Sequence, residues 1–205
     1  MHIPDGFLNL PTAMVTNLVS FGFLAVGIRK VNSALSPKRV PLLGICAAFV
    51  FTIQLISFPI FGGTSVHLTG GVLIAILLGP FSGLVIMATA LIMQAILFQH
   101  GGIITLGANI LNIGIISTVL GYLIYRAFSK NIFIGAGIAS WISLILASIF
   151  CALELGISGK VPLRIAVVGM GSAYAGVGLI EALVVIFILM TIKRLRPDLL
   201  ELNKI

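Results

Sequence analysis

The chain has 205 residues, of which 60% are hydrophobic and only 8% are charged, with a mean hydropathy of +1.25. Soluble globular proteins carry roughly 25% charged residues, so this composition excludes a soluble globular domain and indicates an integral membrane protein. The net charge of +7 does not indicate nucleic-acid binding, because the basic residues stand in short clusters at the ends of apolar runs.

The amino terminus reads MHIPDGFLNLPT and carries neither a basic head nor a small-residue cleavage site, the two marks of a secretory signal peptide. We therefore expect Met1 and His2 to remain in the working protein. The I-P-D-G sequence favours a turn that sends the terminus back into the protein. Residues 1–11 are accordingly predicted to fold into the bundle of a single transmembrane domain that covers 1–205.

Long apolar runs follow, and the length of each is close to the roughly 20 residues that a helix needs to cross a bilayer. They cover 12–28, 41–58, 106–125, 132–155 and 165–192. The stretch 70–98 differs, because LLGPFSG at 77–83 places Gly79 and Pro80 in its middle, where a helix is expected to end or kink. This stretch is either one broken span or two spans, the first of them short.

The distribution of lysine and arginine decides between six and seven spans, because these residues accumulate in cytoplasmic loops. With seven spans and the amino terminus outside, ten of them face the cytoplasm, namely Arg29, Lys30, Lys38, Arg39, Arg126, Lys130, Lys193, Arg194, Arg196 and Lys204. Only Lys160 and Arg164 then lie outside, whereas six spans would divide the twelve residues equally. The sequence therefore predicts an all-α membrane protein with seven transmembrane helices, the third short or re-entrant, and a cytoplasmic carboxyl terminus.

The short third span places a histidine in an inward-folding loop. At 1.5 Å per residue, 71–78 rises only about 12 Å, so the preceding FGGTSVHLTGG at 61–71 is expected to fold into the protein with His67. A weakly similar loop, QHGGIITLGAN at 99–109, contains His100 on the same outer side.

Polar side chains in the outer halves of the predicted helices lie on this side as well. They are Gln54, Gln94, Asn109, Asn112 and Glu154. Each alone is typical of a hydrogen bond between helices, whereas the five together favour a polar pocket open to the outside. Glu181, near the middle of the last span, is expected to be paired within the protein.

The terminus offers three nitrogen ligands close together: the Met1 amine, the His2 backbone amide once deprotonated, and His2 Nδ1. Binding all three to one metal closes a five-membered and a six-membered ring and gives a planar set. One outside imidazole would complete a square, which favours Ni(II) or Cu(II) over tetrahedral zinc. His67 is the best candidate for this fourth ligand and His100 the reserve; alternatively, all three histidines are ordinary terminal or loop residues. Asp5 is either a further acceptor near the site or a turn residue.

Motifs for nucleotide binding and hydrolysis are missing. The chain has no G-x-x-x-x-G-K-[ST], no complete dinucleotide fingerprint, no nucleophile elbow and no H-E-x-x-H. We therefore expect a protein that is not an enzyme and does not hydrolyse ATP itself. Active transport would then draw its energy from a partner or from an ion gradient.

MHIPDGFL, followed by a seven-span apolar chain with a T-S-V-H-L-T-G loop, resembles the substrate-binding membrane component of energy-coupling-factor importers for cobalt and nickel, the CbiM/NikM type. The resemblance covers essentially the whole chain and is greatest to the nickel type. It implies that Met1 and His2 form an N-terminal chelate and that His67 is a further ligand. The residues predicted to lie around this site, but not transferred from the family, are Asp5, Gln94, His100 and Asn109.

The resemblance also implies partners: a transmembrane coupling protein, two cytoplasmic ABC-type ATPases and often a small accessory membrane subunit. Small residues at Gly169, Ala173 and Gly176 would form a helix face toward the coupling protein. We accordingly predict a subunit in the cell membrane that captures Ni(II), with Co(II) second and Cu(II) admitted by ligand geometry. The rival hypotheses are a stand-alone ion-coupled permease or channel, with Glu181 as its coupling site, and a membrane scaffold without a ligand.

Overall fold

The computed structural model describes residues 1–34, 40–60 and 64–201. Three basic residues of the topology argument, Lys38, Arg39 and Lys204, lie outside the described residues, as do residues 61–63 of the predicted inward loop.

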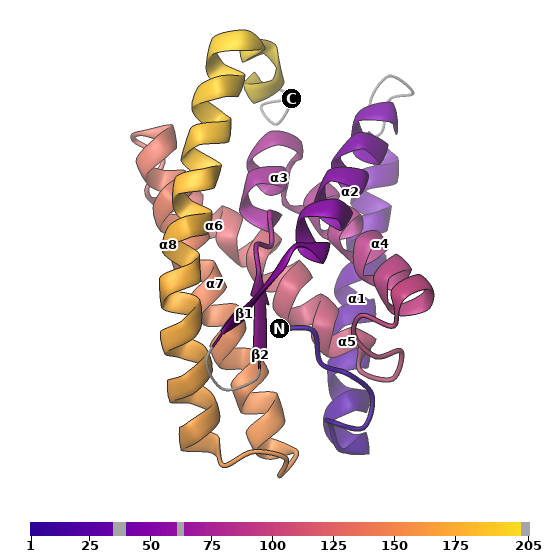
Figure 1. The fold of residues 1–205 in the computed structure, drawn as a ribbon. Coiled ribbons are helices and arrows are strands. Elements are labelled where there is room, and N and C mark those ends of the chain that lie inside the picture. The colour runs from indigo at the N-terminus through magenta and orange to yellow at the C-terminus, as the bar shows by residue number, and fades with distance from the viewer. Residues whose placement is uncertain (35–39, 61–63, 202–205) are drawn as a thin grey trace.

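Helices dominate the described part of the chain (Figure 1). In chain order they are α1 (Leu10–Ala34), α2 (Val40–Leu55), α3 (Gly71–Leu78), α4 (Pro80–Phe98), α5 (Leu106–Asn109), the π-helical η2 (Ile110–Leu120), α6 (Gly121–Ala127), α7 (Ile132–Ile157), α8 (Leu163–Leu195) and the short η3 (Pro197–Glu201). Five described helical stretches are long and apolar enough to cross a membrane, counting α5, η2 and α6 as one, and α2 is a shorter apolar helix. The chain is therefore a multi-pass membrane protein, while the count of seven crossings and their orientation stays a prediction.

The break predicted inside 70–98 is present. Helix α3 has eight residues and is followed by Gly79. The φ of Gly79 is 91°, in the left-handed region that glycine adopts most readily. Helix α4 then begins with Pro80, where the missing backbone N–H removes no intrahelical hydrogen bond. The residues from Gly71 to Ile76 are all buried, so α3 is a short helix inside the bundle.

The all-α prediction holds for the bundle but misses a hairpin between α2 and α3. Strand β1 (Ser57–Ile60) pairs antiparallel with β2 (Thr64–His67), and Ser57 lies opposite His67. Thr64 and Val66 are β-branched residues that favour an extended backbone, a signal too short to register beside the apolar helical runs. The hairpin places His67 at the point where the chain turns into the bundle.

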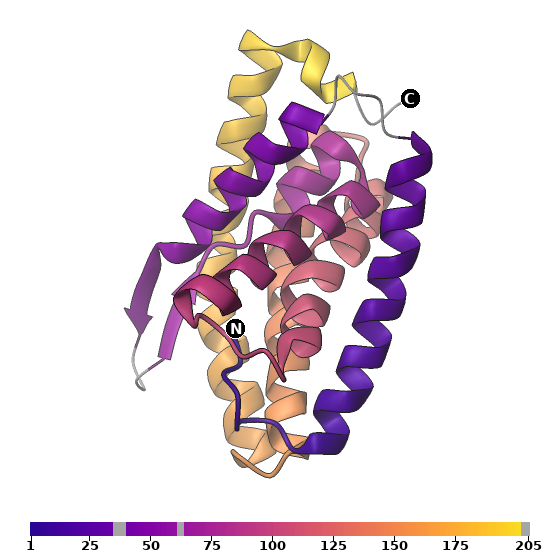
Figure 2. The same ribbon diagram turned by 90° about the vertical axis from the view of Figure 1, so that its right-hand side faces the viewer.

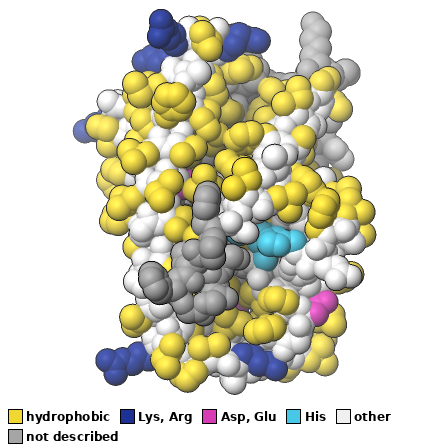
Figure 3. All heavy atoms as spheres, in the orientation of Figure 1, with side chains coloured by type: hydrophobic (Ala, Val, Ile, Leu, Met, Phe, Trp, Pro, Cys, Tyr) yellow, Lys and Arg dark blue, Asp and Glu magenta, His cyan; other side chains and the backbone are white. Residues whose placement is uncertain are grey.

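The arrangement of the helices leaves α1 and α8 on opposite sides of the molecule (Figure 2). Helix α8 packs mainly against α7, and α4 packs against η2, where a Cβ added to Gly83 would lie 3.2 Å from Thr118 Cγ2. Lysine and arginine side chains gather at the two ends of the molecule, with hydrophobic side chains between them (Figure 3). This distribution matches a bundle that crosses a bilayer.

Candidate metal centre

The residues before α1 run back into the bundle. A turn joins the Phe7 N–H to the Pro4 carbonyl at 3.4 Å, and Gly6 has a φ of 87°, as the I-P-D-G sequence predicted. Ile3 is buried, and its backbone is held at both ends by Asn109. The Ile3 N–H donates to Asn109 Oδ1 at 2.7 Å, and Asn109 Nδ2 donates to the Ile3 carbonyl at 3.1 Å. Asn109, predicted as a neighbour of the site, therefore fixes the position of the terminal segment.

Asp5 holds the same segment from its other side. Its carboxylate accepts hydrogen bonds from the backbone N–H groups of Ile103, Ile104 and Thr105, at 3.0, 2.9 and 3.2 Å. A Cβ on Gly102 would collide with this carboxylate, so a glycine is needed there. Asp5 thus clamps the terminal segment to the loop before α5, and within the described residues its hydrogen bonds do not reach the histidines.

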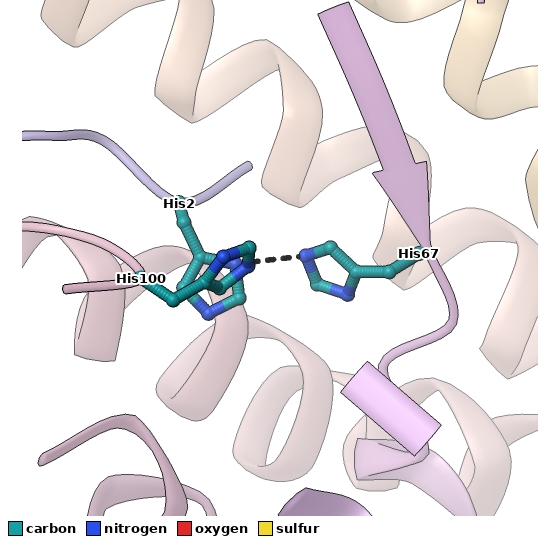
Figure 4. A group of neighbouring side chains, drawn as sticks. All are labelled: His2, His67 and His100. Carbon is teal, nitrogen blue, oxygen red and sulfur yellow. Dashed lines mark hydrogen bonds between the residues drawn. The ribbon is translucent and has the colours of Figure 1, made fainter. Parts of the chain in front are cut away.

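Three histidines from distant parts of the chain converge beside this segment (Figure 4). The ring centroid of His2 lies 4.7 Å from that of His67 and 4.2 Å from that of His100. One nitrogen from each ring lies within 4.8 Å of the others, so the three rings form one group of candidate metal ligands. His67 is buried, whereas His2 and His100 are partly exposed, and histidine side chains reach the surface in Figure 3.

Hydrogen bonding fixes the tautomer of His67. Its Nδ1 lies 3.0 Å from the Leu68 carbonyl oxygen, which can only accept. In a neutral imidazole the proton therefore sits on Nδ1, and the lone pair on Nε2. This Nε2 points toward His2 Nδ1 at 3.0 Å.

The second nitrogen of His2 faces another acceptor. His2 Nε2 lies 2.9 Å from Gln94 Oε1. The Gln94 amide is oriented by its own donation to Gln54 Oε1 at 3.2 Å, and the Gln54 amide donates in turn to the Thr69 carbonyl at 3.1 Å. Gln94 therefore presents its oxygen, not its NH2 group, to His2.

A neutral His2 cannot satisfy both neighbours, because it has one N–H and faces two acceptors. If the proton is on Nε2 for Gln94, the lone pairs of His2 Nδ1 and His67 Nε2 face each other across 3.0 Å. A cation between these nitrogens removes the conflict. With imidazole–metal bonds of about 2.0 Å, two nitrogens at right angles around one ion lie about 2.8 Å apart. The observed separation is close to that value.

A proton is a poor choice for this cation. Burial, followed by the nearby His67, the terminal ammonium and His100, holds the pKa of His2 well below its usual range. Burial, followed by the charge of the terminal ammonium, lowers the pKa of His67 to about 3. Both rings are therefore neutral near pH 7, and their lone pairs are available to a metal.

The terminal amine is placed by a residue that sequence reasoning missed. The Met1 nitrogen donates to Tyr174 Oη at 2.8 Å, and burial lowers the pKa of the amine, which favours the neutral form that binds metals. Tyr174 stands alone in a long apolar run, so no spacing pattern pointed to it. The His2 backbone N–H makes no hydrogen bond to the described residues.

His100 is the third ring of the cluster, and its Nε2 is buried without a hydrogen-bond partner among the described residues. It lies against His2 and not in line between His2 and His67, at 6.3 Å from the His67 centroid. His100 therefore lies beside His2, and its role around a metal stays a prediction.

The predicted pocket of five polar side chains divides into separate buried groups. Gln94 contacts His2 and Asn109 contacts Ile3, while Gln54 bonds Gln94 and reaches the histidine cluster only through it. Asn112 and Glu154 form a pair of their own, in which Asn112 Nδ2 donates to Glu154 Oε2 at 2.6 Å. All five are at most 6% exposed, so these side chains do not line an open pocket.

The Gln94 contact gives a testable prediction. In Gln94→Met the acceptor for His2 Nε2 is lost, so the tautomer with its lone pair on Nδ1 is no longer favoured. We expect nickel affinity to fall by about 10–100-fold, the usual effect of removing the partner of a metal-binding histidine. Thr89→Val is the matched control on the same helix, because Thr89 is exposed and its one hydrogen bond to a described residue is to the Val85 carbonyl. Competition titration of both proteins with a nickel chelator measures the difference, and equal affinities would contradict the tautomer argument.

The chain is similar to known metal transport proteins over nearly its whole length. A family model described as the cobalt uptake substrate-specific transmembrane region, CbiM, matches residues 2–199. A relative from Archaeoglobus fulgidus, whose name describes a fused nickel transport protein, NikMN, is 40% identical over 204 residues, covering 98% of this chain and 68% of the relative. The cobalt transport protein CbiM of Geobacter sulfurreducens is 35% identical over 217 residues, covering 98% of this chain and 61% of the relative. A crystal structure of a truncated transition metal transporter is 33% identical with a TM-score of 0.88, covering 95% of this chain and 99% of that one.

Proposed function

The chain belongs to the CbiM family of cobalt and nickel transport proteins as a substrate-specific membrane component, and we propose that it is the nickel-binding subunit of an energy-coupling-factor importer. Its site holds one Ni(II) ion through the Met1 amine, the deprotonated His2 amide, His2 Nδ1 and His67 Nε2. His100, Gln94, Asn109 and Asp5 surround this set without supplying a planar ligand.

The observation that carries this proposal is the unsatisfied contact of His2. A metal ion on Nδ1 leaves the Nε2 proton for Gln94, so every polar atom of the ring gains a partner. The metal must bind Nδ1 for this to happen, and Nδ1 is the nitrogen that closes a six-membered ring with the His2 amide. Tautomer and chelate geometry thus support the same ligand set.

Nickel fits this set better than cobalt. Four nitrogen donors in a plane suit Ni(II) and Cu(II), whereas Co(II) would need a further ligand or another electronic state. The relatives described above are named for nickel or cobalt transport, which supports these two metals as cargo and leaves copper without support.

The experiment that tests the site starts with the intact mass of the purified protein, which should show Met1 as the first residue. Isothermal titration should then show that one equivalent of Ni(II) binds. The absorption spectrum of the loaded protein should be that of a square-planar nickel complex. Co(II) should bind more weakly, and acetylation of the terminal amine should remove the nickel complex. Nickel affinity that survives acetylation would refute the chelate.

The energy source has its own test. The chain lacks a nucleotide motif, so we propose a transmembrane coupling protein, two cytoplasmic ABC-type ATPases and a small accessory subunit as partners in the cell membrane. The exposed face of α8 suits such a partner, since a Cβ on Gly169 or Gly176 would meet no described atom within 4 Å. In vesicles, the chain alone should bind nickel without concentrating it, and ATP-driven uptake should need the partners. Accumulation by the chain alone in an ion gradient would instead support the permease.

A further inference from the structure

Glu181 is buried near the middle of α8, and its carboxylate is held entirely by one loop. It accepts hydrogen bonds from the Thr69 N–H at 2.8 Å, the Thr69 hydroxyl at 2.6 Å and the Gly70 N–H at 3.1 Å. No ion pair to this carboxylate is formed within the described residues. The prediction that Glu181 is paired inside the protein is therefore correct, and its partner is the segment that joins β2 to α3.

The three donors belong to the amino-terminal end of α3. The first N–H groups of a helix have no acceptor within it, and Gly70 at the N-cap of α3 has no side chain to supply one. The carboxyl group of Glu181, from a different helix, accepts at this end of α3, where its donors are Thr69 and Gly70, the two residues before the first helical residue. Glu181 thus fixes the position of Thr69 relative to α8.

Two paths lead from Thr69 to the proposed nickel ligands. Along the chain, Leu68 is the neighbour of Thr69, and its carbonyl sets the tautomer of His67 at 3.0 Å. Through side chains, the Thr69 carbonyl accepts from Gln54, which orients Gln94. Gln94 in turn sets the tautomer of His2.

We infer that Glu181 is a positioning residue for the metal, which ties α8 to both imidazole ligands through Thr69. This inference rests on the proposed nickel site and adds a residue that never touches the ion. Helix α8 packs mainly against α7, and two of its side chains reach the proposed ligands: Tyr174 contacts the Met1 amine, and Glu181 connects α8 to the two imidazoles through Thr69. Displacing α8 then loosens the metal without breaking a metal–ligand bond directly.

Glu181→Gln tests the inference. The amide keeps one acceptor oxygen, but whichever way it is turned its NH2 group faces a backbone N–H, that of Thr69 or that of Gly70. We expect nickel affinity to fall by about 10–100-fold with faster dissociation, because partners of metal ligands have effects of this size. The absorption spectrum of bound nickel should stay unchanged, since all four ligands remain. Glu154→Gln is the matched control, a buried carboxylate on the neighbouring helix that bonds Asn112, and should change affinity less than twofold.

A second variant separates positioning from folding. Thr69→Val keeps the shape of the side chain and the backbone N–H but removes the hydroxyl donor, and should lower affinity by a smaller factor. Combined with Glu181→Gln, it should add no further loss. Wild-type affinity in Glu181→Gln, equal losses in Glu154→Gln, or a changed nickel spectrum would overturn the inference. If Glu181→Gln does not fold, unchanged affinity in Thr69→Val would overturn it, whereas failure of the wild type to bind nickel would refute the proposed function itself.

Discussion

Replacing His2 with alanine is expected to lower the nickel affinity of the purified protein by more than about a hundredfold, beyond the 10–100-fold typical of residues that only support a metal ligand. The substitution removes Nδ1 and with it the six-membered chelate ring. It also removes the nitrogen that lies 3.0 Å from His67 Nε2, so His67 alone remains of the imidazole pair proposed to hold the metal. Competition titration with a nickel chelator measures the loss, and the square-planar absorption should disappear.

His100→Ala is the control for this prediction. It removes a ring from the same cluster, 4.2 Å from His2, but no member of the proposed planar set. We expect its effect on nickel affinity to be below about tenfold, the lower end of the range for supporting residues. Equal losses in the two variants would mean that the metal is bound by three imidazoles and not by the terminal chelate.

Most of the helices could be predicted from the sequence, because each one is determined by the residues of its own segment. Apolar runs of membrane-spanning length indicated the helices, and a glycine followed by a proline located the break between α3 and α4. The hairpin before His67 was missed, because four-residue strands carry little periodic signal beside long apolar runs. The shortness of the third span nevertheless indicated that His67 lies inside the protein, where it is buried.

Only the part of the candidate site that depends on residue number, the terminal chelate, could be predicted from the ligand chemistry. The ring sizes of a terminal chelate pointed to Met1 and His2 from residue number alone. Tyr174, by contrast, meets the terminal amine across 173 positions, and Glu181 meets Thr69 across 112. Contacts of this kind depend on how helices pack, and a single sequence carries no spacing that reveals them.

Insertion of one alanine between Met1 and His2 is expected to change which residues nickel needs. The histidine then stands third, and the amine, two amides and Nδ1 form two five-membered rings and one six-membered ring. These four nitrogens fill the plane without an outside ligand. Binding should therefore persist in the insertion variant while its dependence on His67 is lost.

The native segment has no room for the extra residue. Met1 is held by Tyr174 and Ile3 by Asn109, and one more residue adds up to about 3.6 Å of chain between them. The complex in the insertion variant should consequently lie away from the histidine cluster, and Gln94→Met should no longer affect its affinity.

Combining the insertion with His67→Ala tests this prediction most directly, because the effect of losing His67 can be compared in the two backgrounds. His67→Ala should lower nickel affinity by more than about a hundredfold in the native-length chain, as expected for a metal ligand and not a supporting residue. In the insertion variant the same substitution should cost less than about tenfold, near the lower limit for supporting residues. An equal cost in both backgrounds would show that His67 does not complete a terminal chelate. A cost confined to the native-length chain would show that nickel needs His67 only when the histidine stands second, where the terminal chelate supplies three nitrogens and not four.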